Sequence, residues 1–187
     1  MKFKFKIQQY QSDAVENTVS VFAGQPSRDA FQFRRDLGKK AAAKITFEEE
    51  YTGYRNSDIE LNDQQLLDNI RKIQDGQDIK QSPKLVSDLG RLGLDIEMET
   101  GTGKTYVYIK TMFELNKQYG WCKYIIVVPS IAIREGVAKS FKMLEEHFME
   151  HYGKKARWFI YDSSNLQQLD NYSSDAGLNV MIINTQA

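Results

Sequence analysis

The sequence has little cysteine, no excess of charge and no long apolar run. Its single cysteine, Cys122, cannot form an internal disulfide, which fits a reducing cytosol. The 25 basic and 25 acidic residues cancel, so any nucleic-acid binding must depend on local placement of charge. No apolar segment approaches the about 20 residues that cross a bilayer, and the start of the chain lacks a signal peptide's apolar core. These absences predict a cytoplasmic protein that does not associate with membranes.

A glycine-rich loop at residues 98–105 is the most informative feature. Gly101 and Gly103 let the backbone turn without hindrance from Cβ atoms, so that amide N–H groups converge on an anion at the start of a helix. Lys104 would reach the β- and γ-phosphates of a nucleotide, and Thr105 would bind Mg²⁺. Met98 stands where the usual pattern has glycine or alanine. The expected nucleotide contacts here are Thr100, Gly101, Thr102, Gly103, Lys104, Thr105 and Tyr106, with Lys104 and Thr105 also catalytic.

Hydrophobic patterning divides the chain into residues 1–92 and 93–187. The first part is expected to hold a helix at 7–22, a polar insertion of uncertain structure at 27–59, and a helix that Asn62 or Asp63 caps. The second part alternates between strands and helices, which predicts an α/β fold with a mostly parallel sheet covered on both faces. Its expected strands are residues 94–98, 124–129, 158–162 and 180–184, and its main helices are residues 103–119 and 131–152.

Gln11 lies well upstream of the glycine-rich loop. The glutamine amide offers one donor and one acceptor side by side, which matches the N6 amino group and N7 of adenine. Guanine presents two acceptors on the same edge and would not match. A glutamine on a polar helix face is ordinarily only solvated, but its place upstream of this loop favours a role in selecting adenine.

Ser130 follows the continuous apolar strand expected at 124–129 and stands where it would cap the next helix. A loop at the carboxyl end of a parallel strand faces the ligand crevice, and a helix amino end can receive a phosphate. Ser130 is therefore either a contact to a nucleic-acid phosphate or a plain helix cap.

Several other polar residues suggest metal sites only weakly. Asn184 stands where a strand of this type would present a carboxylate to Mg²⁺. Asp162 follows a similar strand, but the serines after it favour a helix cap. His147 and His151 have i, i+4 spacing without a convincing third ligand, which favours a solvated helix face.

Taken together, these segments resemble the restriction (Res) subunit of type III restriction-modification enzymes. Only residues 27–59 carry no matching motif. The resemblance implies a RecA-like first lobe of a superfamily-two helicase. It assigns Gln11 to the adenine-reading motif, and it assigns Ser130, Arg134 and Thr185 to contacts with the backbone of double-stranded DNA. The matching segments are Tyr10, Gln11, Ala14 and Val15, then METGTGKTY (98–106), VPSIAIREGV (128–137), YDS (161–163) and INTQA (183–187).

The resemblance also implies parts that this sequence does not contain: an Asp-Glu motif for Mg²⁺ and water after residue 187, a second RecA-like lobe and a nuclease. Res subunits work with a methyltransferase (modification) subunit that recognises the DNA site. The chain is accordingly expected to be an amino-terminal piece, with an incomplete first lobe, of an ATP-dependent DNA translocase and endonuclease. Phosphoryl transfer needs those missing groups, so the piece alone should not hydrolyse ATP at a useful rate.

Two alternatives remain from the residues themselves. One is a small P-loop nucleoside or nucleotide kinase with Asp162 as the magnesium carboxylate. It would need a lid rich in arginine, yet Arg134 and Arg157 are the only arginines after the loop. The other is a non-catalytic, ATP-dependent interaction module in which residues 27–59 dock a partner chain.

Overall fold

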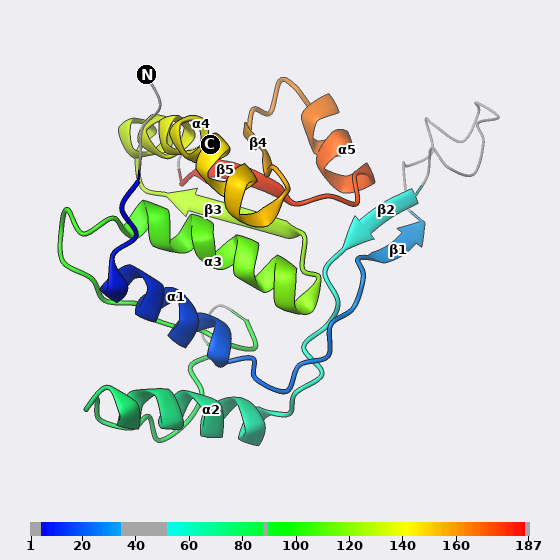
Figure 1. Cartoon of the computed structure of the whole chain (residues 1–187). Coiled ribbons are helices and arrows are strands. Elements are labelled where there is room, and N and C mark those ends of the chain that lie inside the picture. Colours follow the sequence, from blue (N-terminus) through cyan, green and yellow to red (C-terminus); the bar gives the residue numbers. More distant parts are fainter. Residues whose placement is uncertain (1–4, 35–51, 88–89, 186–187) are drawn as a thin grey trace.

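The computed structural model describes residues 5–34, 52–87 and 90–185 (Figure 1). Its central sheet contains β3 (Lys123–Val128), β5 (Asn179–Asn184) and β4 (Arg157–Ile160), all parallel, in the order β3-β5-β4. The helices between and around these strands are α3 (Lys104–Tyr119), α4 (Ile131–Tyr152) and α5 (Gln167–Ser174). The predicted α/β class, with its parallel sheet and alternating helices, is confirmed.

One expected strand is wrong. Residues 94–98 form no strand and do not pair with β3, and an isolated bridge between Val86 and Gly93 precedes them. Leu94 and Met98 instead pack against a cluster on the N-terminal helices, while Ile96 points to solvent. The apolar alternation that suggested a strand therefore results from packing of an extended segment on helices.

The N-terminal helices form a second apolar core beneath α3. They are α1 (Gln9–Ser20) and α2 (Asp63–Gly76), and Figure 1 shows them stacked in the order α2, α1, α3. Val15 and Val19 of α1 pack with Val107 and Leu115 of α3. A capping box starts α2, in which Asn62 Oδ1 accepts from the Gln65 amide and the Gln65 side chain accepts from the Asn62 amide. The prediction of Asn62 as a cap is confirmed.

The polar insertion contains a hairpin of β1 (Phe31–Arg34) and β2 (Thr52–Arg55), which extends away from the sheet (Figure 1). The strands pair antiparallel, with Phe31 opposite Arg55. The basic clusters at 35 and 39–40 and the acidic run at 48–50 lie outside the described residues.

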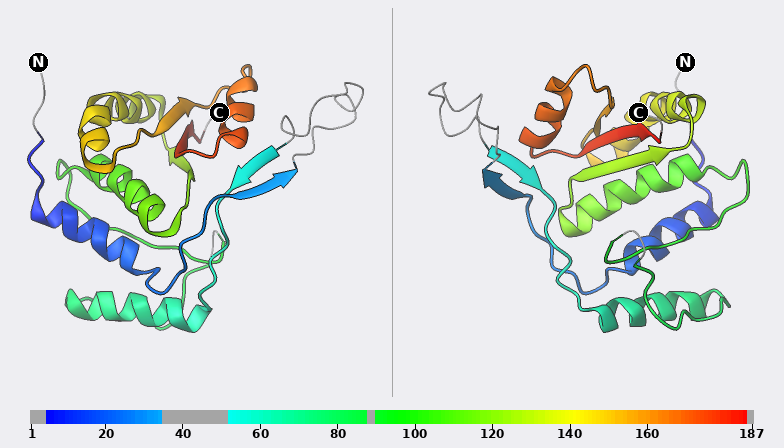
Figure 2. Two further views of the ribbon diagram at one scale, coloured as in Figure 1. Left: turned by 45° about the vertical axis from the view of Figure 1, so that its right-hand side comes forward. Right: turned by 180° about the vertical axis from the view of Figure 1, so that it is seen from behind.

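The main core lies between one face of the sheet and the helices α3 and α4. Ile126, Val128, Val180 and Ile182 point into it from the strands. On the opposite face of the sheet, α5 covers only the region near the amino ends of the strands. There the Tyr172 ring contacts Phe159. Seen from behind, no helix covers most of β3 and β5 (Figure 2).

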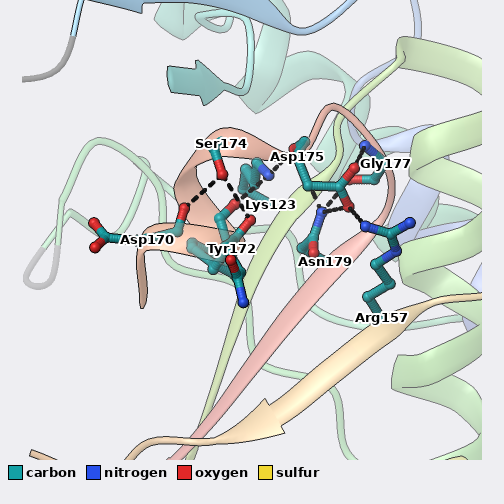
Figure 3. Close-up of polar contacts among 9 residues, drawn as sticks. Lys123, Arg157, Asp170, Tyr172, Ser174, Asp175, Gly177 and Asn179 are labelled. Carbon is teal, nitrogen blue, oxygen red and sulfur yellow. Dashed lines mark hydrogen bonds and ion pairs between the residues drawn. The ribbon is translucent and has the colours of Figure 1, made fainter. Parts of the chain in front are cut away.

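A polar cluster attaches α5 to the amino ends of the strands (Figure 3). The Lys123 ammonium donates to the backbone oxygens of Tyr172 and Asp175, and it lies 5.1 Å from the centre of the Tyr172 ring. The Asp175 carboxylate accepts from Asn179 at 2.9 Å and pairs with Arg157 at 3.1 Å. These contacts fix the turn that leads into β5 and so set its register beside β3.

Among the described residues, every helix is too short or too polar to cross a lipid bilayer.

Candidate nucleotide site and carboxyl edge of the sheet

The glycine-rich loop enters α3 through two residues with left-handed backbone conformation. Gly101 has φ +84° and Gly103 has φ +88°, a region that side chains with a Cβ rarely adopt. Gly103 is the N-cap of α3 and has no side chain to bond the amides of the first turn. A Cβ on Gly103 would also lie 2.5 Å from Nε2 of Gln11. Glycine is thus required here both for the turn and for the approach of α1.

Lys104 is turned back onto its own loop. Its ammonium donates to the backbone oxygens of Met98 and Glu99, the latter at 2.9 Å. Thr102 Oγ1 also donates to the Glu99 oxygen, at 2.6 Å. A phosphate entering the loop would therefore exchange these carbonyl contacts of Lys104 for charged phosphate oxygens, which bind an ammonium more strongly.

Thr105, the expected Mg²⁺ ligand, is half-buried in the first turn of α3. The nearby Tyr108 hydroxyl has a pKa raised above its ordinary value by burial. The loop residues Thr100 and Gly101 are exposed. Every expected phosphate contact between Thr100 and Tyr106 is thus exposed or half-buried.

Gln11 lies directly against the loop. Its Nε2 donates to the Thr102 oxygen at 2.9 Å, and the Tyr10 hydroxyl donates to the same oxygen at 3.2 Å. Gln11 is therefore not a merely solvated residue of α1. Sequence reasoning did not place Tyr10 at the site, although its position beside Gln11 in the matching motif was the available signal.

A groove of about 710 Å³ opens beside the loop, between α1, α2 and the extended segment before the loop. Apolar side chains such as Ile70, Ile73 and Leu94 line its far part. The end next to the loop is lined by Tyr10, Asp13, Met98, Glu99 and Thr102. The groove gives a ligand held by the loop an apolar surface to one side.

The carboxyl ends of β3 and β5 bring together Ser130, Arg134 and Thr185. Ser130 Oγ accepts from the Ile133 amide at 3.3 Å and caps α4. Arg134 Nη1 donates to Oδ1 of the buried Asn184 at 3.0 Å. Thr185 is exposed, and its amide donates to the Val128 oxygen at 3.0 Å. Side chains 50 or more residues apart therefore share one edge.

Asp162 follows β4 at this edge. Its Oδ1 accepts from the amide and the hydroxyl of Ser164, at 2.9 and 2.7 Å. These two bonds hold the pKa of the carboxyl below its usual range, and the guanidinium of Arg134 acts in the same direction. Because α5 begins only at Gln167 and has no side-chain cap, the expected helix cap is wrong, and Asp162 closes a turn before the helix.

His147 is also not on a simply solvated face. Its Nε2 lies 3.1 Å from the hydroxyl of Tyr106, the residue after the glycine-rich loop. Burial lowers the pKa of His147, and the neighbouring His151 lowers it further. Among the described residues, no group of three or more His, Cys, Asp or Glu side chains is arranged to hold a metal ion. The histidine pair therefore belongs to the contact between α4 and α3.

Comparisons with known proteins agree with this arrangement. Residues 4–187 match the family model described as type III restriction enzyme, res subunit. The chain is similar to the EcoP15I Res subunit of Escherichia coli and the EcoPI Res subunit of Escherichia phage P1. Each is 39% identical over 110 residues, which are 58% of this chain and 11% of the relative. The StyLTI Res subunit of Salmonella typhimurium is 46% identical over 65 residues, 33% of this chain and 6% of that protein.

The matched part thus spans about a ninth or less of these curated relatives. The three parallel strands with their helices are consistent with part of a RecA-like domain of the P-loop helicase type. The family match covers nearly every residue. The chain therefore belongs to the family of type III restriction enzyme Res subunits.

Proposed function

We propose that this chain is the amino-terminal ATP-binding part of a DNA-translocating and DNA-cleaving Res subunit. The main support is the joint geometry of Gly103, Lys104 and Gln11: an uncapped helix end, a lysine on loop carbonyls, and an amide from α1 on the same loop. Such a helix end binds anions through its free amides and its dipole. Mg²⁺-ATP is the ligand that the three residues together favour.

In this proposal the triphosphate lies along residues 100–106, with Lys104 on the β- and γ-phosphates and Thr105 on Mg²⁺. Gln11 Nε2 keeps one hydrogen on the Thr102 oxygen and offers the other to adenine N7. Among the described residues, none donates to Gln11 Oε1, so that oxygen is available for the adenine N6 amino group. Adenine selection and loop geometry would thus depend on one side chain.

We further propose that the carboxyl edge of the sheet contacts the backbone of double-stranded DNA through Ser130, Arg134 and Thr185. Asn184 and Glu135 orient the Arg134 guanidinium there, and a phosphate would replace the Glu135 contact. The whole protein would work with a methyltransferase subunit in the cytoplasm. Residues 1–92 would supply the adenine-reading region and 93–187 the first part of the RecA-like lobe.

The interaction-module alternative has one observation in its favour. Phe31 and Phe33 are exposed on the projecting hairpin, and the Arg55 guanidinium lies 5.5 Å from the Phe31 ring centre. A docking role for this hairpin is compatible with the main proposal. The kinase alternative is weaker, because the Asp162 carboxylate is already bonded within its own turn.

Calorimetric titration of Mg²⁺-ATP into the wild-type chain and two lysine variants tests the proposal. Lys104→Ala should weaken binding at least about tenfold, the equivalent of 1.4 kcal/mol. Lys117→Ala, in the last turn of the same helix, removes the same charge far from the loop and should bind as the wild type does. Equal affinities for all three chains would place the nucleotide site elsewhere.

The mass of the natural gene product separates the three readings. A Res subunit requires a chain several times longer than 187 residues, whereas a small kinase or an interaction module does not.

The wild-type chain should also bind ATP without hydrolysing it, and in the longer protein Lys104→Ala should abolish ATP turnover. Steady ATP hydrolysis by the 187-residue chain would contradict the proposal that this part binds ATP but needs the rest of the protein to hydrolyse it.

A further inference from the structure

The groove between α1, α2 and the segment that joins α2 to the glycine-rich loop carries an excess of negative charge. Asp13 lines it from α1, and Asp95, Glu97 and Glu99 line it from the joining segment, against Lys84 as the one cation of the described lining. All four acidic residues are exposed. In the described part of the chain, no ion pair involves any of their carboxylates. Because the chain as a whole is neutral, this charge is a local feature of the groove.

The same groove gathers apolar side chains that face solvent. Ile79, Val86 and Ile96 are 51%, 49% and 47% exposed, and all three lie on the wall that the joining segment forms. The half-buried Ile70 and Ile73 line the groove from α2. Exposed apolar residues that are scattered singly need no explanation, whereas a cluster with a polar rim marks an interaction site.

Acidic residues beside an apolar wall select the chemistry of an occupant. DNA and anionic lipid surfaces carry phosphates, which the carboxylates would repel. A helix with one apolar face can place that face in such a groove. Its lysines or arginines can then reach the carboxylates, while their methylene stems cover further apolar surface. The charge of the groove therefore complements a basic amphipathic helix.

We propose that this groove binds a basic amphipathic helix of a partner protein. The apolar side chains of the helix contact Ile70, Ile73 and Ile96, and its lysines or arginines contact Asp95 and Glu97. This interaction goes beyond nucleotide and DNA binding, because the groove is lined neither by the lysine of the glycine-rich loop nor by the carboxyl edge of the sheet.

Two synthetic helical peptides test the proposal by calorimetry on the longer natural protein and on the 187-residue chain. One peptide carries leucines on one face and lysines on the other, and the second has glutamate in place of every lysine. The lysine peptide should bind both proteins at least about tenfold more tightly than the glutamate peptide. Its affinity should fall as salt is added, because salt screens exposed charges. Equal affinities of the two peptides would overturn the proposal.

Ile96→Glu separates docking in the groove from attraction by charge alone. It adds a negative charge beside Asp95 and Glu97 but removes an apolar contact from the wall, so the lysine peptide should bind at least about tenfold more weakly. Met149→Glu on α4, where the side chain is 42% exposed, adds the same charge outside the groove and should leave the affinity unchanged. Unchanged or tighter binding by Ile96→Glu would contradict the proposal. Val86→Glu, on the same wall, replaces it should Ile96→Glu fail to fold.

A second pair of variants tests the acidic residues. Glu97→Gln should weaken binding of the lysine peptide by about two- to fivefold, the size expected for an exposed ion pair. Glu16→Gln removes the same charge from an exposed position of α1 outside the groove and should leave the affinity unchanged. Equal effects of the two substitutions would mean that the peptide senses only the overall charge of the protein, and the proposed site would be wrong.

Two other occupants give different results. If another part of the same polypeptide fills the groove, the lysine peptide will bind the 187-residue chain but not the longer protein. If a second copy of the chain fills it, sedimentation will show a dimer that Ile96→Glu dissociates. Either result would overturn the proposed partner. None of these measurements uses nucleotide or DNA, so failure of ATP binding would leave the test unaffected.

Discussion

Helices α3 and α4 both begin near the carboxyl end of β3 (Figure 1). Their amino ends differ in one respect. The N-cap of α4 is Ser130, whose hydroxyl accepts from the Ile133 amide. The N-cap of α3 is Gly103, which offers no side chain. An uncapped helix end leaves its first amides for a ligand, whereas the Ser130 hydroxyl already satisfies one amide of α4. The comparison therefore favours a bound anion at the amino end of α3 more strongly than at that of α4.

The largest expected effect comes from giving Gly103 a side chain. Gly103→Ala must hold a left-handed φ, which costs about 1–2 kcal/mol, and its Cβ would meet Gln11 Nε2 at 2.5 Å. The free energy of unfolding should fall by roughly that amount, and ATP binding should weaken because Gln11 is displaced from Thr102. Urea denaturation and calorimetry measure the two effects.

Gly136 in α4 provides the control for that substitution. It is helical and exposed, and a Cβ there meets nothing within 4 Å. Gly136→Ala should therefore raise stability by up to about 1 kcal/mol and leave ATP affinity unchanged. If both alanine variants behaved alike, the special backbone of the glycine-rich loop would have no energetic consequence.

A second, smaller effect is expected on base selectivity. Gln11→Ala removes up to two hydrogen bonds to adenine, each worth about 0.5–1.5 kcal/mol net, so the preference for ATP over GTP should fall by about tenfold. The phosphate contacts of Lys104 and Thr105 are common to both nucleotides, so GTP should lose less affinity. Dissociation constants for both nucleotides measure this change.

Gln9→Ala is the matched control for Gln11, because Gln9 lies on the same helix and its amide donates to the exposed Asp13 rather than to the glycine-rich loop. It should leave the ratio of ATP to GTP affinity unaltered. Unchanged selectivity in Gln11→Ala itself would mean that this residue only supports the loop through Thr102.

The local features at the amino ends of α2, α3 and α4 were predictable from the sequence. The glycines of the loop, the Ser130 cap and the capping box at Asn62 depend on residues a few positions apart. The contacts between distant residues were not predictable. Gln11 meets Thr102 across 91 positions, and Arg134 meets Asn184 across 50. No periodicity in a single sequence encodes such pairs, which only packing creates.

Two sequence-based interpretations failed for the same physical reason. Residues 94–98 alternate like a strand, yet Leu94 and Met98 pack on the cluster of the N-terminal helices and α3. His147 has the spacing of a solvated helix face, yet it meets Tyr106 and the Phe5 ring. In each case the local pattern could not show which distant element packs against the segment.

The smallest expected effect concerns the capped helix. Ser130→Ala removes the hydroxyl that accepts from the Ile133 amide, and losing such a cap costs typically about 1 kcal/mol. The loss should appear as a lower free energy of unfolding in urea, with ATP affinity of the chain unchanged. Ser140→Ala on the same helix removes a hydroxyl that donates to the Gly136 oxygen one turn back, and it should change stability by less than about 0.5 kcal/mol. If Ser130 also contacts a DNA phosphate, as proposed, its removal should weaken duplex binding by the longer protein while Ser140→Ala does not. A stability loss without any change in DNA binding would leave Ser130 as a helix cap alone, and α4 would then differ from α3 in function as well as in capping.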